Sequence, residues 1–203
     1  MGEIGLFTLN VVLLPGERVP LHIFEDRYKE LIGECLEKSE EFGLLLAEET
    51  ELRTVGTSAR VVEVLNRYDD GRMDVVVEGR ERFRVTRVTE STTYLTAEIQ
   101  PFADDEAVGD PELVAGCMSA LERVATAAGT DASAVEISGD EVAWDVASQV
   151  DFGAEFKQEL LEMRTENERL RRLAEALDGA AAAITRQREI RERASGNGKV
   201  DSL

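Results

Sequence analysis

Residues 6–28 read LFTLNVVLLPGERVPLHIFEDRY, and this stretch decides how the first half of the chain folds. Its first part, Leu6–Leu14, is almost entirely apolar and ends at Pro15-Gly16, which is typical of a buried strand followed by a turn. Its last residues open the segment Glu25–Lys38, in which apolar side chains recur at helical spacing behind an acidic start. We therefore predict a strand, an apolar connection and an amphipathic helix.

Short apolar or alternating segments continue to about residue 100. Phe42–Ala47 is a continuous apolar run, and from Val55 the hydrophobic period changes to two. Asp69-Asp70-Gly71 is a strong hairpin signal, and further strands are predicted near residues 73–77, 83–88 and 94–99. This density of strands favours a closed or strongly curled antiparallel sheet.

The composition changes near residue 103, and helical patterns follow. Asp110-Pro111 is a typical helix start, and Gly129 is a typical end. Capping boxes at Ser138–Glu141 and Thr165–Glu168 predict the starts of a second and a last helix. An intervening helix is predicted over residues 152–163.

The last helix carries a stripe of apolar side chains at heptad-like spacing: Leu170, Leu173, Leu177 and Ile184. This stripe packs either on the chain's own helices or on a second copy. The predicted fold class is α+β, with a β-rich subdomain over 1–103, a helical subdomain over 110–193 and a flexible tail over 194–203.

The formal net charge is −19, and it is unevenly spread. Residues 103–156 hold 13 acidic residues and one basic residue, which is −12, so the remainder of the chain carries −7. This charge disfavours nucleic acid and anionic membranes as partners. The acidic stretch is either a solvated surface or a docking face for a basic partner.

No apolar run approaches the ~20 residues that a membrane span requires. The two cysteines, Cys35 and Cys117, belong to no paired motif, so we expect reduced thiols. A bacterial-type cytoplasmic protein is the expectation.

Residues suited to catalysis are scarce. The one histidine, His22, lies between two apolar residues, which favours a structural role, and no Gly-x-Ser-x-Gly motif is present. Gly198-Lys199 lacks the remainder of a phosphate-binding loop. We therefore predict no catalytic residues, no cofactor and no metal site, and we expect that the protein is not an enzyme. The best basic cluster is Arg80, Arg82, Arg84 and Arg87, which is either a solvent face paired with glutamates or a contact for an anion or acidic peptide.

The opening stretch resembles the N-terminal substrate-binding domain of Lon protease. The family pattern is an apolar strand, then Pro-Gly, then Pro-Leu-x-Ile-Phe-Glu-x-Arg-Tyr, and residues 6–28 carry nearly all of it. Thr8 stands where the family often has proline. Gly79-Arg80-Glu81-Arg82-Phe83 and the segment Val142–Ala147 are also similar, so the resemblance covers roughly residues 4–178.

The resemblance implies a PUA-like β pseudo-barrel with one helix, followed by an α-helical bundle with a long last helix. It implies a non-enzymatic module that binds unfolded or apolar polypeptide segments, or an adaptor in protein quality control. The ATPase and protease motifs of Lon are not found in the 203 residues, so the expectation is a stand-alone member of the family. Its expected partners are unfolded segments and a separate Lon-type protease.

Members of this family are similar in using the start of the first helix for substrate contact. By position, the resemblance implies Phe24, Glu25, Asp26 and Arg27 as peptide-binding residues, with Pro20 from the apolar connection. The alternative is a structural protein that dimerises through its helical half, so monomer and weak homodimer both stay open. A small-ligand enzyme in a PUA-like cleft rests on fold analogy alone.

Overall fold

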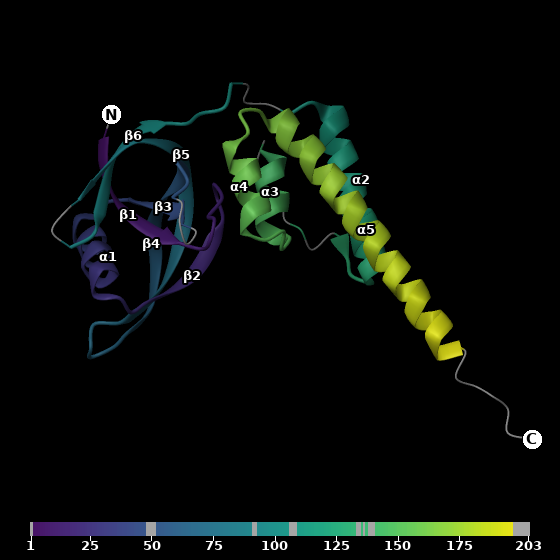
Figure 1. The fold of residues 1–203 in the computed structure, drawn as a ribbon, viewed down its shortest axis with the longest axis horizontal. Coiled ribbons are helices and arrows are strands. Elements are labelled where there is room, and N and C mark those ends of the chain that lie inside the picture. Colours follow the sequence, from purple (N-terminus) through teal and green to yellow (C-terminus); the bar gives the residue numbers. More distant parts are fainter. Residues whose placement is uncertain are drawn as a thin grey trace, which may run out of the picture. The chain divides into compact units, whose positions relative to one another are not determined.

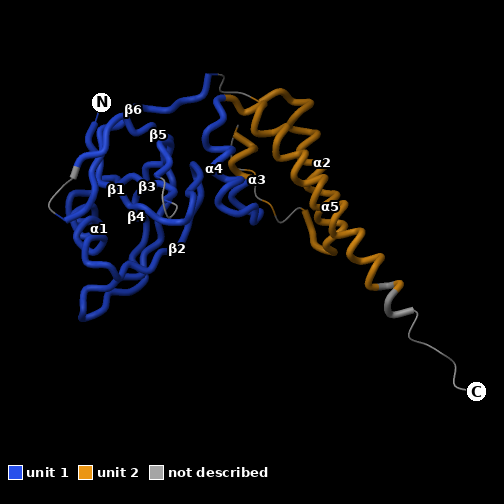
Figure 2. The backbone as a smooth tube through the Cα atoms, in the orientation of Figure 1, with its two compact units in different colours: residues 1–106, 147–164 blue, residues 107–146, 165–203 orange. Residues whose placement is uncertain are grey.

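The computed structural model describes residues 2–47, 52–90, 93–105, 109–132, 135, 137 and 141–196 (Figure 1). Within them the fold is α+β, with one six-stranded sheet and five helices. The chain divides into two compact units, residues 1–106 with 147–164 and residues 107–146 with 165–203 (Figure 2).

The six strands lie in the first unit, together with the helix that interrupts them. The strands are β1 (Gly2–Leu9), β2 (Arg18–Ile23), β3 (Phe42–Leu46), β4 (Val55–Arg67), β5 (Met73–Glu90) and β6 (Leu95–Pro101). The helices are α1 (Asp26–Lys38), α2 (Pro111–Ala128), α3 (Val142–Gln149), α4 (Ala154–Glu162) and α5 (Glu166–Gly196).

The strand pairings form a closed circuit. β5 pairs with β4, β4 with β3, β3 with β1, β1 with β6, and β6 again with β5. The β1–β3 pair is parallel, and the others are antiparallel, so the sheet is mixed and not purely antiparallel as predicted. β2 adds to the outside of this circuit through β5.

The core of the first unit lies between α1 and the sheet. Tyr28, Leu31 and Ile32 of α1 are buried in one cluster with Phe7 and Phe42. The Tyr28 ring stacks on Phe7 at 4.0 Å, and its hydroxyl donates to the Thr8 carbonyl at 2.9 Å. Thr8 Oγ1 also lies 2.9 Å from that hydroxyl. Thr8 therefore helps to fix the start of α1 against β1, and proline in its place could accept at the carbonyl but could not supply the Oγ1 contact.

Three details of the sheet differ from the prediction. β1 ends at Leu9, although Val12, Leu13 and Leu14 are fully buried, because the chain leaves the ladder there. The segment Arg18–Ile23, predicted as part of a connection, is a strand. The two strands predicted near residues 73–77 and 83–88 are one continuous strand, β5.

Glu17 explains why the buried loop before β2 is not a strand. Its carboxylate accepts a hydrogen bond from the Leu14 main-chain N–H at 3.0 Å and pairs with Lys157 Nζ of α4 at 2.5 Å. Gly79 lies so close to the Leu14 carbonyl that a Cβ there would come within 2.1 Å of its oxygen. The Glu17 side chain thus supplies a hydrogen-bond acceptor for the buried main chain of the loop, and the loop packs closely against β5.

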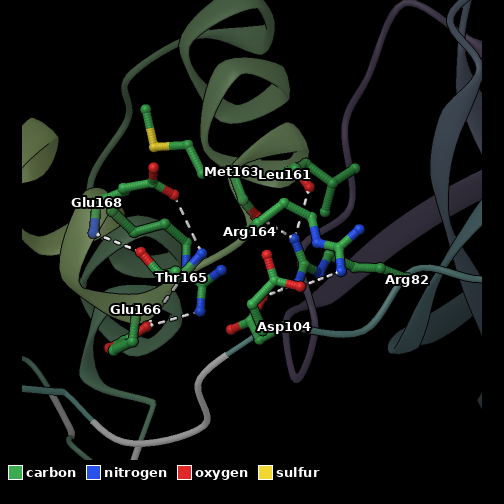
Figure 3. Close-up of polar contacts among 10 residues, drawn as sticks. Arg82, Asp104, Leu161, Met163, Arg164, Thr165, Glu166 and Glu168 are labelled. Atoms are coloured by element: carbon green, nitrogen blue, oxygen red, sulfur yellow. Dashed lines mark hydrogen bonds and ion pairs between the residues drawn. The ribbon is translucent and has the colours of Figure 1, made fainter.

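The helix α4 belongs to the β-rich unit, which moves the boundary that the sequence predicted. Besides the Lys157 pair, Gln158 donates to the Val55 carbonyl at 3.1 Å. The buried Arg82 of β5 donates to the carbonyls of Leu161 and Met163 at 2.8 and 2.6 Å (Figure 3). These contacts join segments about 80 to 140 residues apart, which local sequence patterns do not report.

In the second unit, the predicted start and end of α2 and the predicted start of α5 are confirmed. Asp110 caps α2 by accepting from the Glu112 N–H at 2.8 Å, and α2 ends at Gly129 with φ 76°. Thr165 and Glu168 form the reciprocal capping box of α5, at 3.1 and 3.2 Å (Figure 3). Most of the box predicted at 138–141 lies outside the described residues. α5 continues to Gly196, which lies within the tail predicted over 194–203. Residues 197–203 lie outside the described residues.

The apolar stripe of α5 packs inside its own unit. Leu170, Leu173 and Leu177 are fully buried, as are Cys117 and Ala120 of α2, while Ile184 is only half-buried. This favours packing on the chain's own helices over pairing with a second copy. None of the described helices has the length and apolarity needed to cross a membrane.

Candidate functional site

The outer face of β2 carries a row of exposed side chains. Pro20 and His22 alternate along the strand and point to the same side, and Phe24 continues the row just before α1. The Phe24 side chain is 59% exposed, and its ring stacks on His22 at 5.9 Å. Because Leu21 and Ile23 point to the core, the alternation of the strand itself forces this row outward.

A hydrogen-bond network fixes the middle of this face. Asp74 of β5 lies opposite His22 in the ladder and opposite Asn66 of β4. Its carboxylate lies 2.5 Å from His22 Nδ1, and it accepts from the Tyr68 hydroxyl at 2.7 Å and the Asn66 amide at 3.0 Å. These hydrogen bonds, first that from His22, lower the pKa of Asp74 to about 2.

Aromatic side chains flank the network, and exposed aliphatic side chains lie farther along β4. The ring of Tyr68 meets His22 edge-on at 6.2 Å and is itself 41% exposed. Val62 and Leu65 are exposed on the half of β4 that holds Asn66 and is distorted by bulges. We define the β2 surface as Pro20, His22, Phe24, Tyr68, Val62 and Leu65. It holds four of the eight large apolar side chains that are exposed among the described residues.

The remaining residues implied by the resemblance lie at the start of α1. Glu25 is the N-cap residue, but its side chain makes no capping bond. Instead its carboxylate pairs with Arg27 at 2.7 Å, and Arg27 lies over the Tyr28 ring at 4.5 Å. Asp26 is almost fully exposed and pairs with Lys29 at 3.1 Å. Phe24 therefore adjoins a set of charges that are already paired with one another.

The structure adds residues that sequence analysis did not associate with the site. Tyr68, Asn66 and Asp74 belong to the hairpin, about 50 residues from His22, and only strand pairing brings them together. His22, interpreted from its apolar neighbours as structural, has a side chain that is 46% exposed. The available signal was the alternation Pro20-x-His22-x-Phe24, which becomes informative only once residues 18–23 are recognised as a strand.

The arginine cluster does not form a basic face. Arg80 pairs with Glu78 at 2.9 Å, and Arg87 lies 4.0 Å from Glu98. Arg82, expected on a solvent face, is buried and pairs with Asp104. Arg84 lies over the Phe102 ring at 4.6 Å. The described arginines of β5 are thus mostly matched by carboxylates, as the paired interpretation predicted, and Arg82 is structural.

No group of three or more histidine, cysteine, aspartate or glutamate side chains suited to a metal ion occurs within the described part of the chain. Both cysteines are free and buried, and burial raises the pKa of each thiol to about 11. Thiols of this kind are unreactive at neutral pH.

Within the described residues, the six-stranded sheet and the five helices define an α+β fold. A family model, the substrate-binding domain of the ATP-dependent protease La (LON), matches residues 3–179. The chain belongs to this family.

Relatives and solved structures agree with this assignment. The chain is 30% identical over 210 residues to the Lon protease of Anaeromyxobacter dehalogenans, covering 95% of this chain and 24% of that protein. It is 25% identical over 205 residues to the Lon protease of Paraburkholderia phytofirmans, covering 92% of this chain and 25% of that protein. The chain therefore spans about a quarter of the length of these relatives.

Among solved structures, the Lon N-terminal domain protein of Xanthomonas campestris aligns with a TM-score of 0.64 and 27% identity, covering 85% of this chain and 97% of that one. The N-terminal domain of the Lon protease of the Mycobacterium avium complex aligns with a TM-score of 0.67, covering 89% of this chain and 98% of that one; at 21% identity it supports the fold alone.

Proposed function

We propose that this chain is a non-enzymatic recognition module that binds unfolded or apolar polypeptide segments on its β2 surface. The observation that carries the proposal is Phe24, a large exposed apolar side chain that directly follows β2 and continues the row of Pro20 and His22. Membership of a substrate-binding-domain family supports the same role. Clustered apolar exposure of this kind is common where proteins bind other polypeptides.

The expected affinity is modest. Burying one exposed aromatic side chain contributes about 1.5–3 kcal/mol when the burial is complete, and binding must also offset the ordering of an unfolded segment. A few such side chains therefore give weak and reversible binding, which suits the sampling of many different sequences. The hydrogen bonds of Asp74 with His22 and Tyr68 hold the aromatic rings in place, so little of the binding energy is lost in ordering the surface.

The charges at the start of α1 have a secondary role in the proposal. The side chains next to Phe24 at the start of α1 contact the polar parts of a bound segment. They are those of Glu25, Asp26 and Arg27. Because each is already paired within the helix start, exchanging one of them should change selectivity more than affinity.

Several finer features belong to the same proposal. The closed strand circuit is interpreted as a PUA-like pseudo-barrel, and α2, α3 and α5 as parts of a helical bundle. We propose a cytoplasmic location, consistent with the free buried cysteines. A separate Lon-type protease is the proposed partner for an adaptor role, whereas nucleic acid and membranes are not proposed, because the net charge is −19.

Peptide binding tests the proposal. Short synthetic peptides rich in aromatic and aliphatic residues are titrated against the protein, and Phe24→Ser is compared with Val88→Ser as a matched control. Both residues are exposed apolar side chains of the first unit, at 59% and 44%, but Val88 lies outside the β2 surface. We expect loss of binding in the first variant alone. Equal binding by the two variants would rule out the β2 surface.

A second candidate function is self-assembly through the helical half. Ile190 of α5 is 59% exposed, and Ile184 is half-buried, so these two apolar side chains remain accessible on the C-terminal half of that helix. Leu170, Leu173 and Leu177 are fully buried and are not available. Sedimentation of the protein and of Ile190→Ser over a range of concentrations tests this candidate: a mass that is monomeric throughout removes it.

A further inference from the structure

The strand β2 has one edge without a partner strand. In the sheet order β2-β5-β4-β3-β1-β6, β2 stands at the end, and among the described strands it pairs with β5 alone. The five strands of the circuit each pair with at least two others, because β5 and β6 close it. This open edge belongs to the strand that carries Pro20 and His22.

The ladder identifies which main-chain groups face this open edge. Gly79 N–H donates to the Glu17 carbonyl at 2.9 Å, and hydrogen-bonded pairs alternate in an antiparallel ladder. Val19, Leu21 and Ile23 therefore bond to β5, whereas the N–H and C=O groups of Arg18 and His22 point away from it. Pro20 falls in the outward set, where its missing N–H breaks no bond of the sheet.

The open edge thus offers three carbonyls and two N–H groups in a row. Among the described residues, no loop main-chain group or side chain forms a hydrogen bond with these groups. The gap in the donor row at Pro20 prevents an uninterrupted ladder, which limits pairing of the edge with long strands. Short segments remain suitable, because a few hydrogen bonds on either side of the gap are enough to align them.

The surroundings of the edge select what can pair with it. Residues 17–29 and 60–78, 32 in all, carry six basic and eight acidic side chains, which is −2. The other 171 residues carry −17, so this part is somewhat less acidic per residue than the rest. Beside the edge lie the outward side chains of Arg18, Pro20 and His22, followed by the exposed Phe24. Val62 and Leu65 lie farther from it, because β5 stands between β4 and β2. An extended segment with apolar side chains and little negative charge therefore matches this edge in hydrogen bonding, in hydrophobicity and in charge.

We propose that the open edge of β2 binds an extended apolar polypeptide segment as an added strand. This inference rests on the proposed function and specifies how the segment is held. Main-chain hydrogen bonds to Arg18 and His22 and to the Pro20 carbonyl supply affinity that does not depend on sequence. Alternate side chains of the segment then contact Phe24 and its neighbours, because side chains of adjacent strands on one face lie side by side.

Backbone-methylated peptides test the added strand. A peptide that binds the protein is prepared in two further forms, each N-methylated at every second residue, so that the two forms together cover both edges of the bound strand. One form loses its hydrogen bonds to β2, and we expect its affinity to fall about thirtyfold for two bonds, which is about 2 kcal/mol. The other form keeps them, and we expect its affinity to change by about twofold or less. Equal effects of the two forms would overturn the added strand.

A matched pair of variants gives an independent test. His22→Ala removes the imidazole and keeps the main-chain N–H, whereas His22→Pro removes both. Leu21 already has strand conformation, so it accepts a following proline, as Val19 does before Pro20. We expect His22→Pro to bind the unmodified peptide about fivefold more weakly than His22→Ala, because it lacks one further hydrogen bond. Circular dichroism checks the fold, and if His22→Pro does not fold, the methylated peptides decide alone.

The outcomes separate this inference from the function on which it rests. If apolar peptides do not bind at all, both are wrong. If they bind and Phe24→Ser abolishes binding, but the two methylated forms behave alike, only the added strand is wrong.

Discussion

Replacing Arg82 with alanine tests whether a buried arginine holds α4 on the β-rich unit. The Arg82 side chain is 5% exposed and that of Asp104, its partner, 9%. Its guanidinium group also donates to the carbonyls of Leu161 and Met163, at the end of α4 (Figure 3). Alanine leaves a buried carboxylate and two buried carbonyls without this donor.

The expected loss follows from these contacts. Removing one partner of a buried ion pair costs about 3–5 kcal/mol, and an unsatisfied buried carbonyl costs about 1–3 kcal/mol before the structure relaxes. Because water reaches part of the vacated space, we expect Arg82→Ala to lower the free energy of unfolding by about 3–5 kcal/mol. Removing Asp104 as well should recover part of this loss, with a coupling of about 1–3 kcal/mol.

Urea denaturation measures the effect. All three tyrosines lie in the first unit and the single tryptophan lies in the second, so the two signals report on different units. Arg80→Ala is the matched control, two residues along the same strand, where an exposed pair contributes about 1 kcal/mol or less. If Arg82→Ala costs no more than Arg80→Ala, the buried arginine does not hold α4.

Three further results are expected. The hydrogen bonds to Asp74 lower its pKa to about 2, against an ordinary 3.8. Its ionised form therefore stabilises the fold fully above pH 4, and this contribution is lost as the pH falls through about 2. An NMR titration that gave an ordinary pKa for Asp74 would contradict the network around it. Cys35 and Cys117, whose thiol pKa is raised by burial to about 11, should react with a thiol reagent in urea but not in the native state, and rapid native labelling would contradict their burial. Leu173→Ala should lower the free energy of unfolding, measured by tryptophan fluorescence, by about 2–5 kcal/mol, because Leu173 is fully buried. Ile190→Ala should lower it by about 0.5 kcal/mol or less, because Ile190 is exposed. Similar losses in the two variants would mean that the apolar stripe of α5 is not packed as described.

Patterns of short range determined the fold class and most helix ends. The α1 helix, the cap at Asp110, the end at Gly129 and the capping box at Thr165 all depend on residues within four positions of one another. Such signals survive in sequence because the hydrogen bonds concerned are formed inside one turn. The most specific part of the family resemblance was likewise one continuous stretch, residues 6–28.

Strand boundaries were less accurate, for a specific reason. Proline within residues 18–23 is a poor signal for a strand, yet it is tolerated at an edge position that makes no ladder bond. The buried apolar run at Val12–Leu14 was instead predicted as part of a strand although it is a loop. A buried loop and a buried strand have the same apolar pattern in sequence.

The sequence by itself determined an α+β chain with an apolar connection before the first helix, because periodicity and caps are local properties. Only the tertiary structure decided that β2 is an edge strand, that Tyr68 and Asp74 join His22 beside Phe24, and that Arg82 is buried against α4. Each of these depends on strand pairing or packing between segments more than 40 residues apart. The free energy of such long-range pairing and packing depends on how the whole chain folds, so no local sequence pattern encodes it.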